Sequence, residues 1–361
     1  MANSIFFKVK LKGNGIVNFD SSDQKYALKR CGIGLPDGLN DNYKFGKKAY
    51  FKNENGDMTF VPKISADCIR HEIFGIVQHP ALTSSDIELC DFLSNMMVLM
   101  RGWLFTMNGD AIRRASALRE SCALETSGAV PVLEACANSE NKELTETSLH
   151  YSESLGDTEY MFKGIIDFKT LEFLTCDVLS DCRGFKEDWI HGDDALLNIA
   201  FENRYGKIPY KAGFYTSEDT NLSDFFAEYG IKFDIEFCKQ MIKEFFKRIL
   251  KLRIERATGY AEIDSLYIKF NNNPFVDRLN DDENGWFKLE YNDVDSIDFD
   301  MKDYFIEVVD KERGTKRQQF ESICQELKDR IEKKRKEKKA QKEEKKSSKS
   351  KKDNNKQEEE A

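Results

Sequence analysis

DIEFCKQMIKEFFKRILKLRIERA, residues 234–257, carries the strongest helical pattern of this 361-residue chain. Apolar residues recur at spacings of three and four, which places them on one helix face: Ile235, Cys238, Met241, Ile242, Phe245, Phe246 and Ile249. The other side has a lysine at every fourth position: Lys239, Lys243, Lys247 and Lys251. We predict an amphipathic helix from Asp234 to about Ala257, ended by Gly259. Its lysine side is either a solvated face or a track for phosphates.

A strand is predicted at each end of the main body of the chain. Residues 4–12 alternate apolar side chains with Phe6, Lys8, Lys10 and Lys12, so one face of this strand is lined by lysines that could hold phosphates. Residues 262–270 form a second apolar strand after the long helix, and the sequence Asn-Asn-Asn-Pro ends it.

Three further helices are expected between these strands. Residues 65–77 and 85–106 show helical apolar spacing, and Asp86 suits the N-terminus of the second helix. A shorter helix is predicted near residues 193–202.

The middle of the chain predicts a hairpin, because residues 160–168 and 171–178 read as strands joined through Lys169 and Thr170. The resulting order is strand, helix, strand, strand, helix, strand. This α+β order is that of the ferredoxin-like fold of RNA-recognition domains, with large insertions at about residues 105–159 and 179–233. The usual aromatic RNA-stacking signature is missing, so any RNA would be held mainly through its backbone.

The window RGWLFTMNGDAIRRASALRE (101–120) is a candidate anion contact. Arg113, Arg114 and Arg119 alternate with Ser116 and small alanines, which would let a phosphate backbone approach closely. Guanidinium and hydroxyl groups both donate hydrogen bonds to phosphate. The alternative is that these arginines are solvated or paired with the acidic residues of the same window.

Charge is distributed unevenly along the chain. The net charge is −9, yet residues 311–361 contain 19 basic and 12 acidic residues and carry +7, which leaves −16 for residues 1–310. An acidic body argues against wholesale wrapping in nucleic acid, although a narrow basic track remains possible. We predict a C-terminal helix over residues 311–339 and a disordered lysine-rich tail over residues 340–361, which serves as a solubility tail or as a non-specific RNA or DNA tether.

The cysteines and the apolar runs predict a cytoplasmic protein. Nine cysteines are scattered without any Cys-x-x-Cys pair, so the spacing offers no zinc site. No apolar run approaches the roughly 20 residues that span a bilayer. The opening MANSIFFKVKLKG interrupts its apolar residues with lysines, unlike a signal peptide. No membrane partner is expected.

An enzyme remains an alternative. The segment DVLSDCRGFKEDWIHGDD (177–194) contains side chains that could gather around a divalent metal and cleave phosphodiesters: Asp177, Asp181, Asp188, His191, Asp193 and Asp194. Their spacing matches no ligand rule, and the last two lie where a helix would begin, so helix capping explains them better. His71 is either a general base or a structural hydrogen-bonding residue. An acidic scaffold that binds no nucleic acid is the third alternative.

Four segments in order resemble one family. They are HEIFG (71–75), MRGWLF (100–105), RRASALRE (113–120) and TSLHYSESLGDTEYMFKGIIDFKTLEFLTCD (147–177). They resemble the backbone subunits of CRISPR effector complexes, the Cas-seven group of the RAMP superfamily, over roughly residues 60–270. The resemblance implies an RNA-recognition-type palm within residues 1–310, with inserted fingers and a thumb hairpin.

The resemblance also implies a function. Many copies would polymerise along a guide RNA with other effector subunits, meet target DNA or RNA through the guide and serve antiviral defence without a catalytic role or a cofactor. Arg113, Arg114, Ser116 and Arg119 would grip guide phosphates, with His71 and Arg101 nearby. The lysine faces of the first strand and the long helix complete the predicted RNA contact: Lys8, Lys10, Lys12, Lys243 and Lys247.

Overall fold

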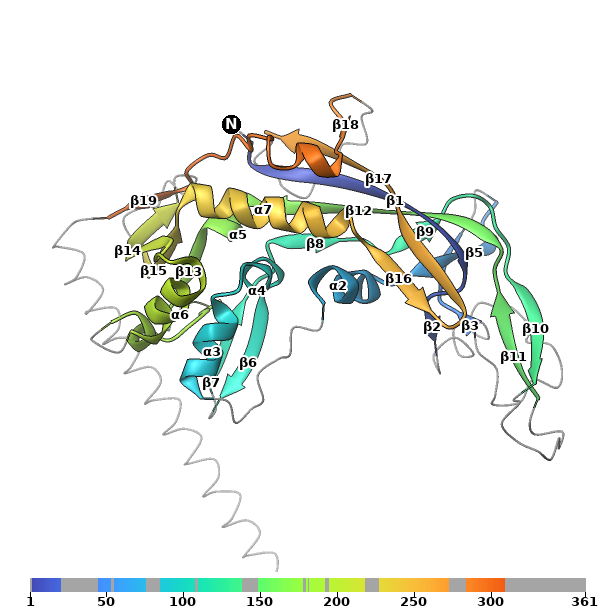
Figure 1. The fold of residues 1–361 in the computed structure, drawn as a ribbon, viewed down its shortest axis with the longest axis horizontal. Coiled ribbons are helices and arrows are strands. Elements are labelled where there is room, and N and C mark those ends of the chain that lie inside the picture. Colours follow the sequence, from blue (N-terminus) through green and yellow to red (C-terminus); the bar gives the residue numbers. More distant parts are fainter. Residues whose placement is uncertain are drawn as a thin grey trace, which may run out of the picture. The chain divides into compact units, whose positions relative to one another are not determined.

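A computed structural model gives the structure of the protein (Figure 1). It describes residues 2–20, 45–52, 55–75, 85–107, 110–137, 149–177, 180, 182–191, 195–217, 227–272 and 284–308. The chain divides into two units, residues 1–307 and 308–361, and every element below belongs to the first. The predicted C-terminal helix at 311–339 and the lysine-rich tail at 340–361 lie outside the described residues.

The first predicted strand, β1 (Ser4–Gly15), lies in the middle of the largest sheet. It pairs antiparallel with β12 (Asp157–Asp167) on one side and with β17 (Gly259–Asn271) on the other. β17 continues to β16 (Arg253–Arg256) and β18 (Phe287–Lys288). β12 continues to β8 (Leu118–Glu120), β9 (Ala123–Glu125), β5 (Met58–Ile64) and β4 (Lys48–Lys52).

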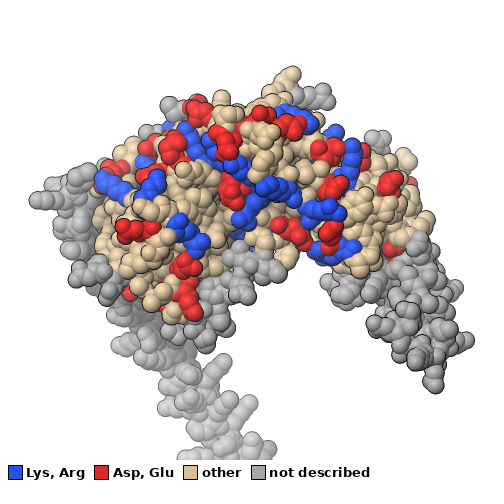
Figure 2. Space-filling view, viewed as in Figure 1, with Lys and Arg blue, Asp and Glu red and all other residues tan. Residues whose placement is uncertain are grey.

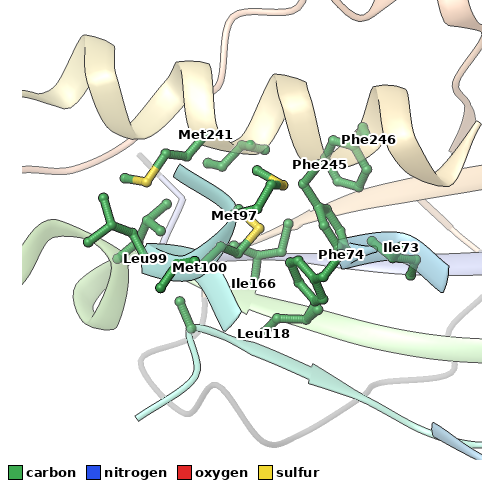
Figure 3. Packing of buried hydrophobic residues seen from close by; sticks show 14 of the residues in the cluster. Ile73, Phe74, Met97, Leu99, Met100, Leu118, Ile166, Met241, Phe245 and Phe246 are labelled. Atoms are coloured by element: carbon green, nitrogen blue, oxygen red, sulfur yellow. The ribbon is translucent and has the colours of Figure 1, made fainter. Parts of the chain in front are cut away.

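Helix α7 (Ile235–Ile249) covers one face of this sheet, and the apolar alternation of β1 explains why. Phe7 points to this side and meets the rings of Phe245 and Phe246 edge-on, with centroids 5.6 and 6.2 Å away. Two more helices, α2 (Ala66–Phe74) and α4 (Met96–Arg101), pack under α7 (Figure 3).

A second, four-stranded sheet follows the first. Its order is β13 (Phe173–Thr175), β15 (Glu228–Phe233), β14 (Tyr210–Ser217) and β19 (Phe305–Glu307), all antiparallel. The helical elements of this region are α3 (Asp86–Leu93), α5 (Phe168–Glu172), η2 (Glu187–Ile190) and α6 (Leu196–Tyr205). The short helix η3 (Tyr291–Asp293) lies instead at the end of α7, where Lys251 Nζ lies 4.6 Å from the Tyr291 ring centroid.

Three two-stranded ribbons complete the described part. They are β2 (Phe19–Asp20) with β3 (Phe45–Gly46), β6 (Trp103–Met107) with β7 (Asp110–Arg114), and β10 (Val132–Ala137) with β11 (Leu149–Ser154). The protein is therefore a mixture of helices and mostly antiparallel strands, as the α+β prediction required.

The long helix is shorter than predicted. α7 ends at Ile249, and residues 253–256 form β16, which turns directly into β17. The apolar spacing changes there from three and four to two, because Ile254 is buried between exposed Arg253 and Glu255. Gly259 therefore lies in the β16–β17 hairpin instead of ending the helix.

The predicted helix at 85–106 is two helices and the start of a strand. Ser85 begins α3 with a capping box, and Asn95 begins α4 by accepting a hydrogen bond from the Met97 amide at 2.9 Å. Gly102, with φ +76°, ends α4, and β6 follows at once.

The predicted hairpin of residues 160–168 and 171–178 is wrong. Residues 160–167 do belong to β12, but α5 follows and β13 joins the second sheet. Asp167 caps α5 by accepting a hydrogen bond from the Lys169 amide at 3.1 Å, so a helical turn replaces the expected hairpin turn. β12 pairs instead with β8 and β9, so the expected insertion at 105–159 contributes strands to the main sheet.

Candidate nucleic-acid interface

The face of β1 that points away from α7 carries a row of basic residues. Lys8 lies opposite Lys163 on β12 and opposite Tyr267 on β17, and Tyr267 lies opposite Lys288 on β18. Partners across an antiparallel pair share one face of the sheet. Lys8 also lies over the ring of Trp286, 4.3 Å from its centroid.

Further cations lie on the same face, in the rows two residues before and two residues after Lys8 along β1. Phe6 lies opposite Ile165 and Lys269, and Ile165 lies opposite Arg119 on β8. Lys10, in the row beyond Lys8, lies opposite Met161 and Ser265. We call these six residues the basic sheet face: Lys8, Lys10, Arg119, Lys163, Lys269 and Lys288.

The geometry of a sheet brings these charges close together. Neighbouring strands are about 4.8 Å apart, and alternate residues of one strand about 7 Å. Lys10, Arg119 and Lys288 are exposed, and the other three are half-buried. Lys288 is paired, because its Nζ lies 2.5 Å from Glu290 Oε1. This concentration of positive charge stands out in a chain with net charge −9, whereas acidic and basic side chains are interspersed over the side shown in Figure 2.

Lys12 lies at the end of this face and is paired. Its Nζ lies 2.6 Å from Asp264 Oδ1, and the hydrogen bond to Asp264 raises the pKa of Lys12. Glu159 and Glu262 lie directly opposite Lys12 on the two neighbouring strands. The predicted phosphate contact therefore has an acidic border at this residue.

Arg114 is buried and does not line the surface that the sequence predicted. Its Nη2 donates hydrogen bonds to the carbonyls of Thr170 and Leu171, at 2.7 and 3.0 Å. Its guanidinium lies 5.8 Å from the ring centroids of both Trp103 and Phe233. Burial lowers the pKa of Arg114 to about 10. The prediction of a phosphate contact for Arg114 is corrected, because this side chain fastens β7 to α5.

The rest of the predicted anion-contact window, residues 101–120, forms the β6–β7 ribbon and strand β8 instead of a loop. Arg113 is exposed on β7, and Arg119 is exposed on β8 as part of the basic sheet face. The Ser116 hydroxyl donates to the Leu118 carbonyl at 2.7 Å and accepts from the Leu118 amide, so it shapes the turn between the two strands. Arg101 is half-buried at the end of α4, and His71 is exposed on α2, both on the helical side of the sheet.

The lysines of α7 are paired within the chain. Lys247 Nζ donates to Asp295 Oδ2 at 2.7 Å, and this hydrogen bond raises the pKa of Lys247. Lys243 donates to the Asp295 carbonyl at 2.8 Å, and Lys239 donates to Asp298 at 2.9 Å. The predicted phosphate track is thus lined by an acidic segment of the same chain.

The acidic constellation considered for a metal is not assembled by the described residues. Asp177 is buried, Asp188 is exposed, and His191 Nε2 lies 2.8 Å from the Tyr229 hydroxyl. Asp181, Asp193 and Asp194 lie outside the described residues. Within the described part of the chain, no group of three or more histidine, cysteine, aspartate or glutamate residues could hold a metal ion.

Sequence reasoning missed half of the basic sheet face. Lys163, Lys269 and Lys288 belong to strands whose alternation could have assigned each to a face. Which strands are neighbours, and in which register, could not be read from that alternation.

A family model described as Type I-Fv CRISPR-associated protein Cas7fv-like matches residues 2–302. The chain belongs to this Cas7fv-like family. Its predicted resemblance to the Cas7 group is confirmed, and the protein is a subunit of a CRISPR effector complex. Among curated proteins, no sequence matches the chain significantly.

Solved structures of CRISPR complexes show distant similarity to this Cas7fv-like chain. A chain of a "CRISPR RNA-guided surveillance complex" is 11% identical, with a TM-score of 0.34, over 73% of this chain and 68% of that chain. A chain of a pre-nicking surveillance complex is 8% identical, with a TM-score of 0.35, over 73% and 77%. A "Type IV-B CRISPR Complex" chain is 13% identical, with a TM-score of 0.24, over 44% and 73%.

None of the described helices is long and apolar enough to cross a membrane.

Proposed function

We propose that this chain is the guide-RNA-binding backbone subunit of its CRISPR effector complex and that the basic sheet face holds the phosphates of the guide. The observation that carries the proposal is the cross-strand arrangement of Lys8, Lys10, Lys163 and Arg119 on one face of the central sheet. A lysine or arginine that reaches a phosphate neutralises its charge and releases bound counterions, which strengthens binding.

The strand order supports a ferredoxin-like palm under this face. The chain passes from β1 through helices to β8 and β12, and then through α7 to β17, with β1 paired between β12 and β17. With the other strands between them counted as insertions, these elements match the βαββαβ order of RNA-recognition folds, in which the sheet is covered by helices on one side only. The uncovered side of such a sheet is the expected RNA-binding side.

We further propose that copies of this chain assemble side by side along the guide, together with other effector subunits, in the cytoplasm. Target DNA or RNA would then be recognised by base pairing to the guide, as in other RNA-guided complexes. The role is binding and assembly in antiviral defence, without catalysis. Family membership supports this part of the proposal.

Two neutralising double variants test the interface. The variant Lys10→Gln with Lys163→Gln removes two cations of the basic sheet face, and Lys243→Gln with Lys247→Gln removes two cations of α7 that are paired with Asp295. Both change the net charge equally. Affinity for a single-stranded RNA is measured by fluorescence anisotropy at about 0.1 M salt.

We expect the sheet variant to lose at least about tenfold in affinity and the α7 variant to lose less than about threefold. Equal losses would show that only net charge matters, and an unaffected sheet variant would exclude this face. Assembly is tested by native mass spectrometry with RNAs of increasing length, where the number of bound copies should rise in steps. Incubation with RNA and Mg²⁺ should leave the RNA intact.

A further inference from the structure

A cavity of about 470 Å³ lies between α5 and the second sheet. Tyr215 on β14 and Glu228 on β15 lie opposite each other across the sheet, and both line it. Lys169 and Thr170 line it from α5. The volume falls within the range of pockets that enclose small organic ligands.

Three aromatic side chains form the apolar part of the lining. The Phe173 ring lies 5.7 Å from the Tyr215 ring in an edge arrangement and 4.7 Å from the Phe305 ring in a stacked one. These residues come from three different strands, so the second sheet holds the rings in fixed relative positions. Aromatic rings of this kind bind planar heterocycles by stacking and edge contacts.

The polar part of the lining contains both donors and acceptors. Lys169 is a cation, Ser180 supplies a hydroxyl, and Glu228 supplies a carboxyl group that hydrogen-bonds to the Thr175 side chain. Burial raises the pKa of Glu228.

Arg114 forms part of the same wall, and two of its nitrogen atoms make no hydrogen bond to the described residues. These two atoms, Nε and Nη1, are buried. The residue as a whole is 6% exposed. A buried guanidinium with two unpaired donors is costly unless an acceptor reaches it. Because these two nitrogen atoms are themselves buried, the cation that the wall presents to a ligand is Lys169.

We propose that this cavity binds a single nucleotide, with its base against Phe173, Tyr215 and Phe305 and its phosphate toward Lys169. A nucleotide combines a flat heterocycle, hydroxyl groups and an anion, and the lining offers a partner for each. None of the six residues of the basic sheet face lines the cavity, so this site is separate from the proposed RNA interface.

A cavity-filling variant tests the site. Ala115 is exposed and lines the cavity, so Ala115→Trp should block it without disturbing the core. Ala111 is exposed on β7, which ends one residue before Ala115, and does not line the cavity, so Ala111→Trp is the matched control. The full chain is titrated with AMP, GMP, CMP and UMP, and with ribose 5-phosphate, by isothermal titration calorimetry.

We expect at least one nucleotide to bind at least about tenfold more tightly than ribose 5-phosphate, which lacks the base. Ala115→Trp should lower that affinity at least about tenfold, and Ala111→Trp should leave it unchanged. Lys169→Ala should weaken the monophosphate more than the corresponding nucleoside. A wild-type affinity that Ala115→Trp leaves intact would overturn the proposal.

A second measurement separates a free nucleotide from a base of bound RNA. A photoreactive oligoribonucleotide is crosslinked to the protein and the crosslinked residues are identified by mass spectrometry. If crosslinks at Phe173 or Tyr215 disappear in Ala115→Trp and no monophosphate binds, the cavity holds a base of RNA instead of a free nucleotide. If neither monophosphates nor the oligonucleotide reach the cavity, the proposal fails, while the result for Lys10 and Lys163 stands independently.

Discussion

The guanidinium of Arg114 donates to the carbonyl oxygen of Thr170 across 2.7 Å and joins the ribbon strand β7 to α5, 56 residues further along the chain. A second hydrogen bond, to the Leu171 carbonyl, strengthens the same joint. Trp103 and Phe233 enclose the charge. A residue that the sequence assigned to RNA thus stabilises the junction of two structural elements.

Replacing Arg114 should destabilise the fold. Arg114→Ala leaves two buried carbonyl groups with one donor fewer and opens a cavity between aromatic rings, so we expect a loss of about 3 kcal/mol in the free energy of unfolding. Arg113→Ala, at the exposed neighbouring position, should cost less than about 1 kcal/mol. Urea denaturation followed by circular dichroism measures both, and similar losses would contradict the structural role of Arg114.

A methyl group at Gly164 should disrupt the core beneath α7. A Cβ atom there would lie 2.1 Å from Cζ of Phe7, a ring that is 0% exposed and enclosed by Phe162 and Phe245. We expect Gly164→Ala to cost about 1–3 kcal/mol in thermal or urea unfolding. Gly156→Ala is the control, because a Cβ atom there meets nothing within 4 Å. A smaller ring-free side chain, in Phe7→Leu, should partly rescue Gly164→Ala.

Stability should depend on pH through Glu172. This carboxyl is 0% exposed, accepts a hydrogen bond from the Tyr304 amide at 3.0 Å and lies 3.5 Å from Lys232 Nζ, which also binds Asp303. Burial raises the pKa of Glu172 from 4.5 to about 7. The folded state therefore holds this proton more tightly than the unfolded state, so the associated stability is complete below pH 4.5 and is lost as the pH rises to 7.

Glu172→Gln should remove this dependence, because an amide stays neutral and still accepts the hydrogen bond from Tyr304. The free energy of unfolding should then vary less between pH 4.5 and 7, by up to about 3 kcal/mol, in buffered urea titrations. Glu202→Gln, at an exposed helix position, is the control and should follow the wild-type profile. An unchanged profile in Glu172→Gln would assign the pH dependence to other groups.

RNA affinity should fall with salt in proportion to the phosphates contacted. Removing one lysine that reaches a phosphate lowers the slope of log affinity against log salt by about 1. We expect this decrease for Lys10→Gln and no change for Lys239→Gln, whose Nζ is paired with Asp298. Anisotropy titrations at several salt concentrations give the slopes. A slope for Lys10→Gln equal to that of the wild type would show that Lys10 is not part of the interface.

Several elements could be predicted because their patterns are local. The apolar alternation of residues 4–12 identified β1 and its lysine face, and the spacing in residues 235–249 identified α7. The end of α7 was missed, since Lys251 continues the lysine spacing while the backbone already turns toward β16. Local patterns place a residue on a face, but they do not show where one element gives way to the next.

The sequence by itself determined the family resemblance, the central strand, the main helix and the lysines of β1. Only the tertiary structure decided which cations share a surface. Lys163 and Lys269 join the face of Lys8 through pairings across more than 100 residues, and Arg119 joins it through Ile165 of β12. The tertiary structure also buries the Arg114 side chain and pairs Lys247 with Asp295. The physical reason is that burial and Coulomb interaction depend on distance in space, and strand register and packing set that distance.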